Sequence, residues 1–434
     1  MAFKALKNMW LNTLITAGLL VLFFPPASRP APREWMQQGG NSAHTGGEGV
    51  VPGTPFLTWK TRARDAFFAA PALVGEHILL GDAGGNLNCY RRRSGRRSWG
   101  RHGSGYYAGS PVCDGERAYA ACTRRDQWEE TSSAGGIFSG QGTQSVTMVS
   151  EKTTLGCYRL ADGMKLWTRR FPGLVHGTPA LGEGRLVLAC QDFKTYCLDS
   201  LHGRQLWEVK AEGPLESSPV IDSGRVLVGS LAGKLYCLSL RDGELLWRYR
   251  VDSPIRVAPA ASRGGVFFAA LDGRLRCLAL STGDLIWEKD LGHILVTSPV
   301  IAGTTIVVAC SDATVRALHG GTGEELWRTK PARELIRSLA VSGQVLVTGS
   351  EEGKLAARSL ENGEQIWEYQ LGRNDTPLIS LAGEEIYASS PDRALYCIGS
   401  EKKPLLGRRD PAPVSRLSLE PARGEVPAAR RKKE

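Results

Sequence analysis

The chain has 434 residues, of which 42% are hydrophobic and 23% are charged, and this balance excludes a disordered or collagen-like polymer. Its net charge of +10 lies mainly at the two ends, because residues 1–35 carry +3, residues 401–434 carry +5 and the body carries only +2. A near-neutral body excludes a nucleic-acid-binding domain, which would carry basic charge as a stripe on its folded surface. The 51 Gly and 11 Trp, against 5 Met, favour strands joined by tight turns over a helical bundle.

Residues 1–34 are predicted to be a signal peptide or an N-terminal membrane anchor, followed by a linker. Lys4 and Lys7 precede an apolar run at residues 11–24, which ends at two prolines. This run is shorter than the roughly 20 residues that span a bilayer, which favours a cleaved signal, but the small-residue cleavage pattern is poor and a retained anchor stays open. The first cysteine is Cys89, so no lipid-accepting cysteine follows the run. Both alternatives predict an exported chain, periplasmic or membrane-anchored and facing the periplasm.

Tryptophan recurs every 40 residues, which is a period typical of repeat folds. One gap in the series is 28 residues longer than the others. Allowing for this insertion, a cysteine or alanine stands thirty residues after each tryptophan. The series therefore predicts eight repeats. The tryptophans, expected to be structural residues between neighbouring repeats, are Trp59, Trp99, Trp167, Trp207, Trp247, Trp287, Trp327 and Trp367.

Each repeat is predicted to contain four antiparallel strands. A glycine stands four residues before seven of the tryptophans, usually after Asp, Asn, Ser or Thr, and such dipeptides favour tight hairpin turns. In the repeat around Trp247 we expect strands at residues 217–221, 225–230, 234–239 and 245–250. The third of these has apolar side chains on both of its faces, so its sheet is predicted to be covered on both sides.

Eight such units predict an all-β fold, an eight-bladed β-propeller of four-stranded antiparallel blades that spans residues 35–400. The first tryptophan belongs to a lone strand at residues 56–62, whereas the last repeat stops after residues 395–398 without such a strand. We expect this N-terminal strand to complete the last blade and to close the ring without exposed edges.

Two further segments depart from the repeat. Residues 123–150 are predicted to be a loop insertion between the second and third strands of the second blade, either a lid or partner-contact arm or a solvated excursion. Residues 401–434 are basic and Pro-rich and are predicted to be a disordered tail. This tail either serves solubility or touches anionic lipid or acidic polymers.

The repeats resemble those of a known family. Leu235–Trp247 (LYCLSLRDGELLW) and Leu275–Trp287 (LRCLALSTGDLIW) are similar to the repeats of pyrroloquinoline-quinone-type (PQQ-like) β-propellers, and Trp35–Gly46 resembles the stretch that often precedes their first blade. The resemblance covers residues 35–398 and implies the propeller fold, with the tryptophan stacking between blades. In size and in its minimal blades, the chain most resembles the outer-membrane assembly factor BamB among the relatives in this family.

The same resemblance implies a quinoprotein dehydrogenase as an alternative, with a quinone and Ca²⁺ over the central channel. Such enzymes carry neighbouring cysteines beside the cofactor and long pocket-building loops, whereas no two cysteines are adjacent here and seven blades stay near 40 residues. The sequence also lacks His-x-x-x-His and Cys-x-x-Cys spacings and a Gly-x-Ser-x-Gly elbow. We therefore expect no cofactor, no metal and no catalytic residues. A propeller that senses a small ligand in its channel is a third alternative.

The ten cysteines occupy repeated strand positions that small residues fill in other blades, which favours buried thiols over disulfides. Cys122/Cys157 and Cys190/Cys197 are expected to be diagonal neighbours on one face if two-residue turns join their strands. Diagonal neighbours lie roughly 7 Å apart, too far for the roughly 3.8 Å between the Cβ atoms of a disulfide.

The loops from each fourth strand to the next first strand share one face of the ring. Aromatic, aliphatic and Arg residues gather there around the channel mouth, which is typical of a protein-binding surface; loop residues that merely plug the channel are the alternative. The predicted partner-binding face comprises Phe67, Phe68, Tyr106, Tyr107, His176, Glu216, Arg256, Arg337, Asn374 and Asp375. The sequence thus favours an exported, monomeric, non-catalytic scaffold that binds envelope or outer-membrane assembly proteins.

Overall fold

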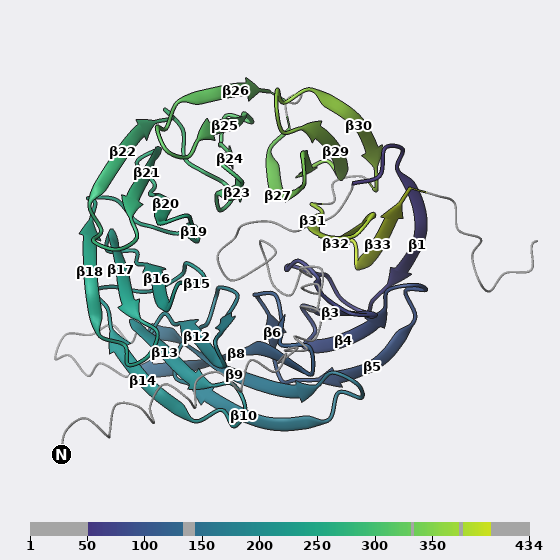
Figure 1. Cartoon of the computed structure of the whole chain (residues 1–434). Helices are drawn as coiled ribbons and strands as arrows, with labels where there is room; N and C mark the ends of the chain where they lie inside the picture. The colour runs from purple at the N-terminus through teal and green to yellow at the C-terminus, as the bar shows by residue number, and fades with distance from the viewer. Residues whose placement is uncertain (1–50, 133–143, 331–333, 373–375, 401–434) are drawn as a thin grey trace, which may run out of the picture.

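The computed structural model describes residues 51–132, 144–330, 334–372 and 376–400, with the backbone alone described for residues 126–132 and 144–151. These residues form eight antiparallel sheets, arranged as the blades of a ring (Figure 1). The predicted all-β, eight-bladed propeller is confirmed. The predictions for residues 1–34 and 401–434 concern segments outside the described residues. The described part of the chain contains no helix that is both long and apolar enough to cross a membrane.

Six blades within the described residues consist of four consecutive strands, which run from the channel outwards. The first two of these blades are β2 (Ala72–Val74), β3 (His77–Gly81), β4 (Asn86–Arg91) and β5 (Arg97–His102), and β11 (Ala180–Gly182), β12 (Arg185–Ala189), β13 (Lys194–Asp199) and β14 (Gln205–Lys210). The next two are β15 (Val220–Asp222), β16 (Arg225–Gly229), β17 (Lys234–Ser239) and β18 (Leu245–Arg250), and β19 (Ala260–Ser262), β20 (Gly265–Ala269), β21 (Arg274–Ala279) and β22 (Leu285–Asp290). The remaining two are β23 (Val300–Ala302), β24 (Thr305–Ala309), β25 (Val315–His319) and β26 (Glu325–Thr329), and β27 (Ile336–Ser342), β28 (Val345–Ser350), β29 (Lys354–Ser359) and β30 (Gln365–Gln370).

The last blade joins the two ends of the propeller. Its strands are β31 (Leu378–Ala382), β32 (Glu385–Ser390), β33 (Ala394–Gly399) and, on the outside, β1 (Phe56–Arg62). Strand β1 pairs antiparallel with β33, from Phe56 opposite Gly399 to Arg62 opposite Ala394. The N-terminal strand therefore completes the last blade, as the sequence predicted.

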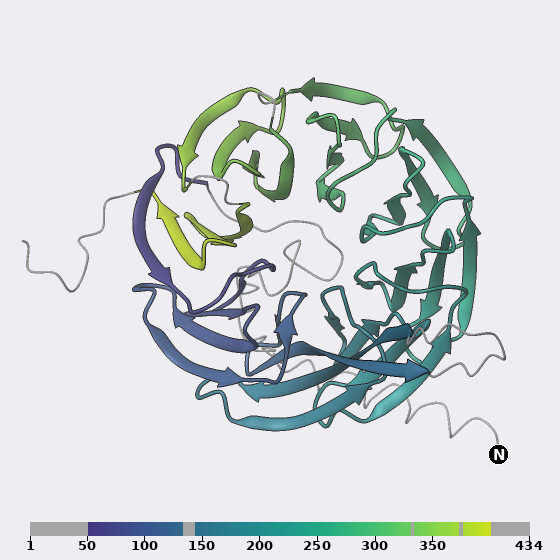
Figure 2. The same ribbon diagram turned by 180° about the vertical axis from the view of Figure 1, so that it is seen from behind.

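The second blade carries the insertion. Its outer strands are β8 (Arg117–Ser132), β9 (Gln144–Arg159) and β10 (Lys165–Phe171), and its inner edge is divided into β6 (Tyr106–Tyr107) and β7 (Val112–Cys113). Strands β8 and β9 pair without a register shift out to Ser132 opposite Gln144, and they run past β6 and β10 toward the blade of β11–β14 (Figure 2). The prediction of a loop at residues 123–150 was wrong for most of the segment. Its two halves, which contain Thr and Val, pair with each other as antiparallel strands and so satisfy their backbone hydrogen bonds. Residues 133–143 lie outside the described part.

The core lies between blades rather than within them. In β17, Leu235 and Cys237 belong to one buried apolar cluster, while Tyr236 and Leu238 belong to the cluster on the opposite face. Each blade is therefore covered on both faces, as the alternation of β17 predicted. Burial of both faces stabilises each blade only in contact with its neighbours, because the blade cannot cover its own apolar surfaces.

The eight repeated tryptophans lie between neighbouring blades. Each indole Nε1–H donates a hydrogen bond to a backbone carbonyl of the next blade, at distances of 2.7 to 3.2 Å. These bonds run from Trp59 to Arg92, Trp99 to Leu160, Trp167 to Ser200, Trp207 to Leu240, Trp247 to Leu280, Trp287 to Gly320, Trp327 to Leu360 and Trp367 to Pro52. The bond from Trp367 joins the seventh blade to Pro52, four residues before the outer strand of the last blade, and the bond from Trp59 joins the last blade to the first.

Local backbone features place each tryptophan in this contact. The ladder between the third and fourth strands shifts register just before the tryptophan, so that Cys237 faces Trp247 while Leu238 faces Leu245. The bulge leaves Leu246 exposed and turns Trp247 inward. Trp247 then packs on Gly283 of the next blade, where φ is +79° and an added Cβ would lie 2.7 Å from the indole ring. Glycine is therefore required in the Gly-x-x-x-Trp pattern for two reasons: the turn needs a positive φ, and the indole of the preceding blade packs against the glycine backbone.

The ten cysteines all lie in the described ranges, and none of them is part of a disulfide there. The expectation that Cys122 and Cys157 share a face was wrong: Cys157 pairs with Tyr119, three residues from Cys122 on the same strand, so the two side chains point to opposite faces. Cys190 and Cys197 likewise belong to different interblade clusters. Burial raises the pKa of the Cys237 thiol to about 12, which keeps it neutral at physiological pH.

The interblade indole bond makes a testable contribution to stability. In Trp247→Phe, the buried carbonyl of Leu280 loses its donor and part of the ring volume is left empty, so we expect the free energy of unfolding to fall by about 2–4 kcal/mol in urea denaturation. The adjacent Leu246→Ala removes an exposed side chain and is expected to change it by about 0.5 kcal/mol or less. Equal losses in the two variants would contradict the assignment.

Candidate functional site

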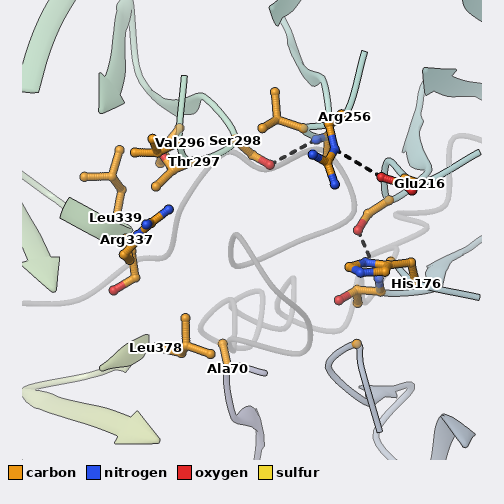
Figure 3. A pocket seen from close by; sticks show the side chains of 18 of the residues that line it. Ala70, His176, Glu216, Arg256, Val296, Thr297, Ser298, Arg337, Leu339 and Leu378 are labelled. Atoms are coloured by element: carbon orange, nitrogen blue, oxygen red, sulfur yellow. Dashed lines mark hydrogen bonds and ion pairs between the residues drawn. The ribbon is translucent and has the colours of Figure 1, made fainter. Parts of the chain in front are cut away.

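The loops that join consecutive blades meet around one end of the channel. Side chains from these loops and from the starts of β27 and β31 line a cavity of about 340 Å³ at this end, which we call the channel mouth (Figure 3). In an antiparallel blade the loop after the fourth strand lies at the same end as the turn between the second and third strands. The regular length of the repeat therefore brings one loop from each blade to the channel mouth.

In several of the described loops an anchoring residue directly precedes a mouth residue. Leu215 and Ile255 are fully buried under their blades, and the residues that follow them, Glu216 and Arg256, line the mouth. The same pattern places Val175 in the core and His176 at the mouth. A buried apolar side chain thus fixes the backbone of each loop and directs the next side chain toward the channel.

This alternation corrects part of the predicted partner-binding face. Phe67 and Tyr107 are 0% and 1% exposed, so they are core residues in the anchoring position rather than contact residues. Phe68 is 55% exposed and Tyr106 is half-buried. The structure brings four predicted residues together at the mouth, His176, Glu216, Arg256 and Arg337. Asn374 and Asp375 lie outside the described residues.

The charged residues of the mouth are held in pairs. Arg256 Nε donates to Glu216 Oε2 at 3.1 Å, and Gln191 Nε2 donates to Glu216 Oε1 at the same distance. The Glu216 side chain is 17% exposed and that of Arg256 is 57% exposed, so the pair presents the guanidinium to solvent. Arg337 lies across the mouth from Arg256 and Glu216 (Figure 3), and it pairs with Glu351.

Hydroxyl groups connect neighbouring blades beneath these charges, and sequence reasoning missed them. The backbone N–H of Thr178 donates to Ser218 Oγ at 2.9 Å, and that of Ala258 donates to Ser298 Oγ at 3.1 Å. Thr178, Ser218 and Ser298 each precede a proline, eleven residues after a tryptophan, and this Ser/Thr-Pro repeat is the signal that identifies them. Since each bond joins two blades, the loops of the mouth share one rigid base.

A buried carboxylate stands beside Arg337 in the same blade. Glu334 is 8% exposed and accepts hydrogen bonds from Lys354 Nζ and from Ser350 Oγ, the latter at 2.7 Å. Burial alone would raise the pKa of Glu334, but these two hydrogen bonds hold it below its ordinary value. The pKa of the neighbouring Glu352 is raised, chiefly by its hydrogen bond with Glu334.

The residues of the mouth do not fit a quinone held with Ca²⁺. Among the described residues that line it, the carboxylate is Glu216, and both of its oxygens are already bound by Arg256 and Gln191. Within the part of the chain that the structure describes, the lining has no cysteine and no Phe, Tyr or Trp ring. Ca²⁺ prefers several oxygen ligands, which this lining does not offer as free carboxylates.

The repeats match a family model described as "Outer membrane protein assembly factor BamB" over residues 117–257 and 256–404. The chain belongs to this family. The match to the BamB family begins in the second blade, and the structure shows that the first blade has the same four-stranded form. No curated protein sequence matches the chain.

Solved structures share the fold of this BamB-family chain. BamB from Moraxella catarrhalis is 15% identical, with a TM-score of 0.65, and the match covers 80% of this chain and 100% of that one. The computationally designed protein Ika8 is 16% identical, with a TM-score of 0.65 and 81% and 100% coverage. Quinohemoprotein alcohol dehydrogenase from Comamonas testosteroni is 11% identical, with a TM-score of 0.66 and 86% and 81% coverage. At these identities the likeness concerns the fold alone.

The alternation of anchoring and mouth residues predicts a large effect on stability for one substitution and a small effect for its neighbour. Ile255→Ala opens a cavity under the blade and is expected to lower the free energy of unfolding by about 2–5 kcal/mol. Arg256→Ala removes an exposed ion pair and is expected to change it by about 1 kcal/mol or less. Chemical denaturation of the two variants measures both, and a larger loss for Arg256→Ala would refute the alternation.

The lowered pKa of Glu334 predicts a pH-dependent contribution to stability. Since the carboxylate has a lower pKa in the folded chain than in the unfolded one, its contribution is present above about pH 4.3 and is lost as the pH falls further. Glu334→Gln should therefore lower the free energy of unfolding by about 1–3 kcal/mol at pH 7, and the difference from wild type should shrink toward pH 3. Urea denaturation at both pH values measures this, with the exposed Glu361→Gln as the control. A difference that does not vary with pH would rule out the carboxylate as its cause.

Proposed function

We propose that this chain is an exported, non-catalytic propeller scaffold of the cell envelope, and that its channel mouth binds a protein of outer-membrane protein assembly. Membership of the family described by the name BamB supports the process, and the apolar run at residues 11–24 supports export. The bound partner is expected to contact the mouth loops, with the propeller acting as a monomer.

The observation that carries this proposal is the rigid presentation of contact side chains. Arg256, His176 and Phe68 are exposed, yet each stands next to a buried anchor in the chain. Arg and aromatic side chains are enriched in protein interfaces, where a few of them supply most of the binding energy. Because the anchors and the interblade hydroxyl bonds already order these loops, a partner would bind without a large cost in conformational entropy.

The proposal is tested by co-purification from solubilised envelope membranes. Wild type is expected to retain outer-membrane assembly proteins. The double variant Arg256→Ala/Arg337→Ala is expected to retain at least about tenfold less of them, because each lost guanidinium weakens binding by about 1 kcal/mol or more. The control is Arg204→Ala/Arg241→Ala, which removes two arginines from turns between third and fourth strands, at the opposite end of the ring. Equal retention by the two double variants would exclude the channel mouth as the contact surface.

Two further measurements address the other parts of the proposal. Purified protein supplied with pyrroloquinoline quinone and Ca²⁺ is expected not to reduce a dye with alcohols or sugars, and dye reduction would establish a dehydrogenase instead. The intact mass of the mature protein decides between a cleaved signal and a retained anchor at residues 11–24.

A further inference from the structure

A second cavity lies away from the channel mouth, between the blades β19–β22 and β23–β26, which are neighbours in Figure 1. It has a volume of about 270 Å³. Its lining includes Gly264 in the turn between β19 and β20 and Gly320 in the turn between β25 and β26. These turns lie at the end of the ring opposite the mouth, because successive connections in an antiparallel blade alternate between its two ends.

Two of the glycines that line this cavity replace larger residues of other blades. Gly320 occupies the repeat position that holds Leu240, Leu280 and Leu360 in other blades, and each of these leucines is at most 6% exposed. Gly265 stands where the third and fourth blades carry an arginine at the start of the second strand. Between the fifth and sixth blades neither position carries such a larger side chain.

The backbone of Gly320 keeps the interblade hydrogen bond that the other repeats make. Its carbonyl accepts the indole N–H of Trp287 at 2.8 Å, as Leu280 does for Trp247 at the same distance. A Cβ built on Gly320 would lie 3.1 Å from the Thr304 carbonyl oxygen and 3.5 Å from Ile306 Cδ1 and Phe267 Cζ, so the last two are the side chains that face the missing one. The interface thus keeps its shape around an apolar hollow.

The walls of the hollow determine what it accepts. Phe267, Cys277, Ile301 and Ile306 are all at most 5% exposed, and they supply an apolar wall. His319, whose Nδ1 lies 3.2 Å from Thr322 Oγ1, adds one polar ring among the lining residues. A charged group would lose its hydration against these walls. Among the lining residues, Arg263 at the rim is the one that could offer a countercharge.

We infer that this cavity binds a small, uncharged aromatic molecule, which takes the place of the leucine side chain missing at Gly320. Apolar cavities of comparable or smaller size accept benzene-sized ligands, and a volume of about 270 Å³ lies just below the range of drug-sized sites. A single hydroxyl on the ring would find its partner at His319. This inference does not rest on the proposed function, because no residue that lines the cavity lines the channel mouth.

The test uses phenol as the probe and the full propeller as the protein. Isothermal titration is expected to show one site with a Kd of about 1 mM or lower. Gly320→Leu restores the side chain of the other blades and should raise the Kd at least tenfold, while Gly320→Ala should raise it by a smaller factor. The mouth variant Arg256→Ala should bind phenol like wild type, so loss of partner binding and loss of phenol binding are separable.

A structural measurement keeps the inference decidable if Gly320→Leu does not fold. Crystals of the wild type soaked in 4-bromophenol should show the bromine between Phe267 and Ile306, the side chains nearest to the missing leucine. The inference is overturned if phenol does not bind to the wild type, if Gly320→Ala binds it as well as wild type does, or if the bromine lies elsewhere.

Discussion

The hydrogen bond from each tryptophan indole to a carbonyl of the next blade is the interaction on which the ring depends. A blade is apolar on both faces and cannot cover itself, so it is stable only between two neighbours. Hydrophobic contact alone is not directional, whereas an N–H that must find its acceptor in the low-dielectric interior fixes the rotation of one blade relative to the next. Eight repetitions of the same rotation bring the last blade to the first, and the bond from Trp59 to Arg92 joins them.

A closed ring separates the parts of the sequence that must repeat from those that can vary. The outer strands hold the tryptophan, its preceding bulge and the glycine of the next blade, and these features repeat with little change. The inner loops keep little more than an anchoring apolar residue, such as Leu215 or Ile255, and, in six of the eight repeats, a hydroxyl or small residue before proline. The side chain between these two constraints is free to be Glu216 in one blade and Arg256 in the next, which is how a mouth surface with its own chemistry arises on a repetitive frame.

The sequence predicted the repeated frame well and the variable surface only in part. Strand β17 was predicted at its observed bounds because the period and the turn glycines determine both ends of the hairpin. The β8–β9 extension was not foreseen, since Gly, Ser and Thr in the insertion also fit a loop and its pairing depends on a partner strand rather than on local preference. Phe67 and Tyr107 were assigned to the surface by residue type, but exposure in these loops follows the position of the anchor. The hydroxyl bonds at Ser218 and Ser298 join residues one full repeat apart, so the Ser/Thr-Pro signal appears only when the repeats are compared with one another.

The acceptor of the indole bond shows why variation within the frame is tolerated. The tryptophan binds a backbone carbonyl, so any residue can stand at that position without breaking the ring. Leu280 fills its interface, Gly320 leaves its interface hollow, and Arg92 reaches across to the last blade, where its Nε donates to the Tyr387 hydroxyl at 3.2 Å. The same backbone geometry therefore supports an apolar, an open and a polar interface in one molecule. A propeller built on side-chain complementarity alone would not allow these substitutions, because each would alter the angle between blades and prevent the ends from meeting.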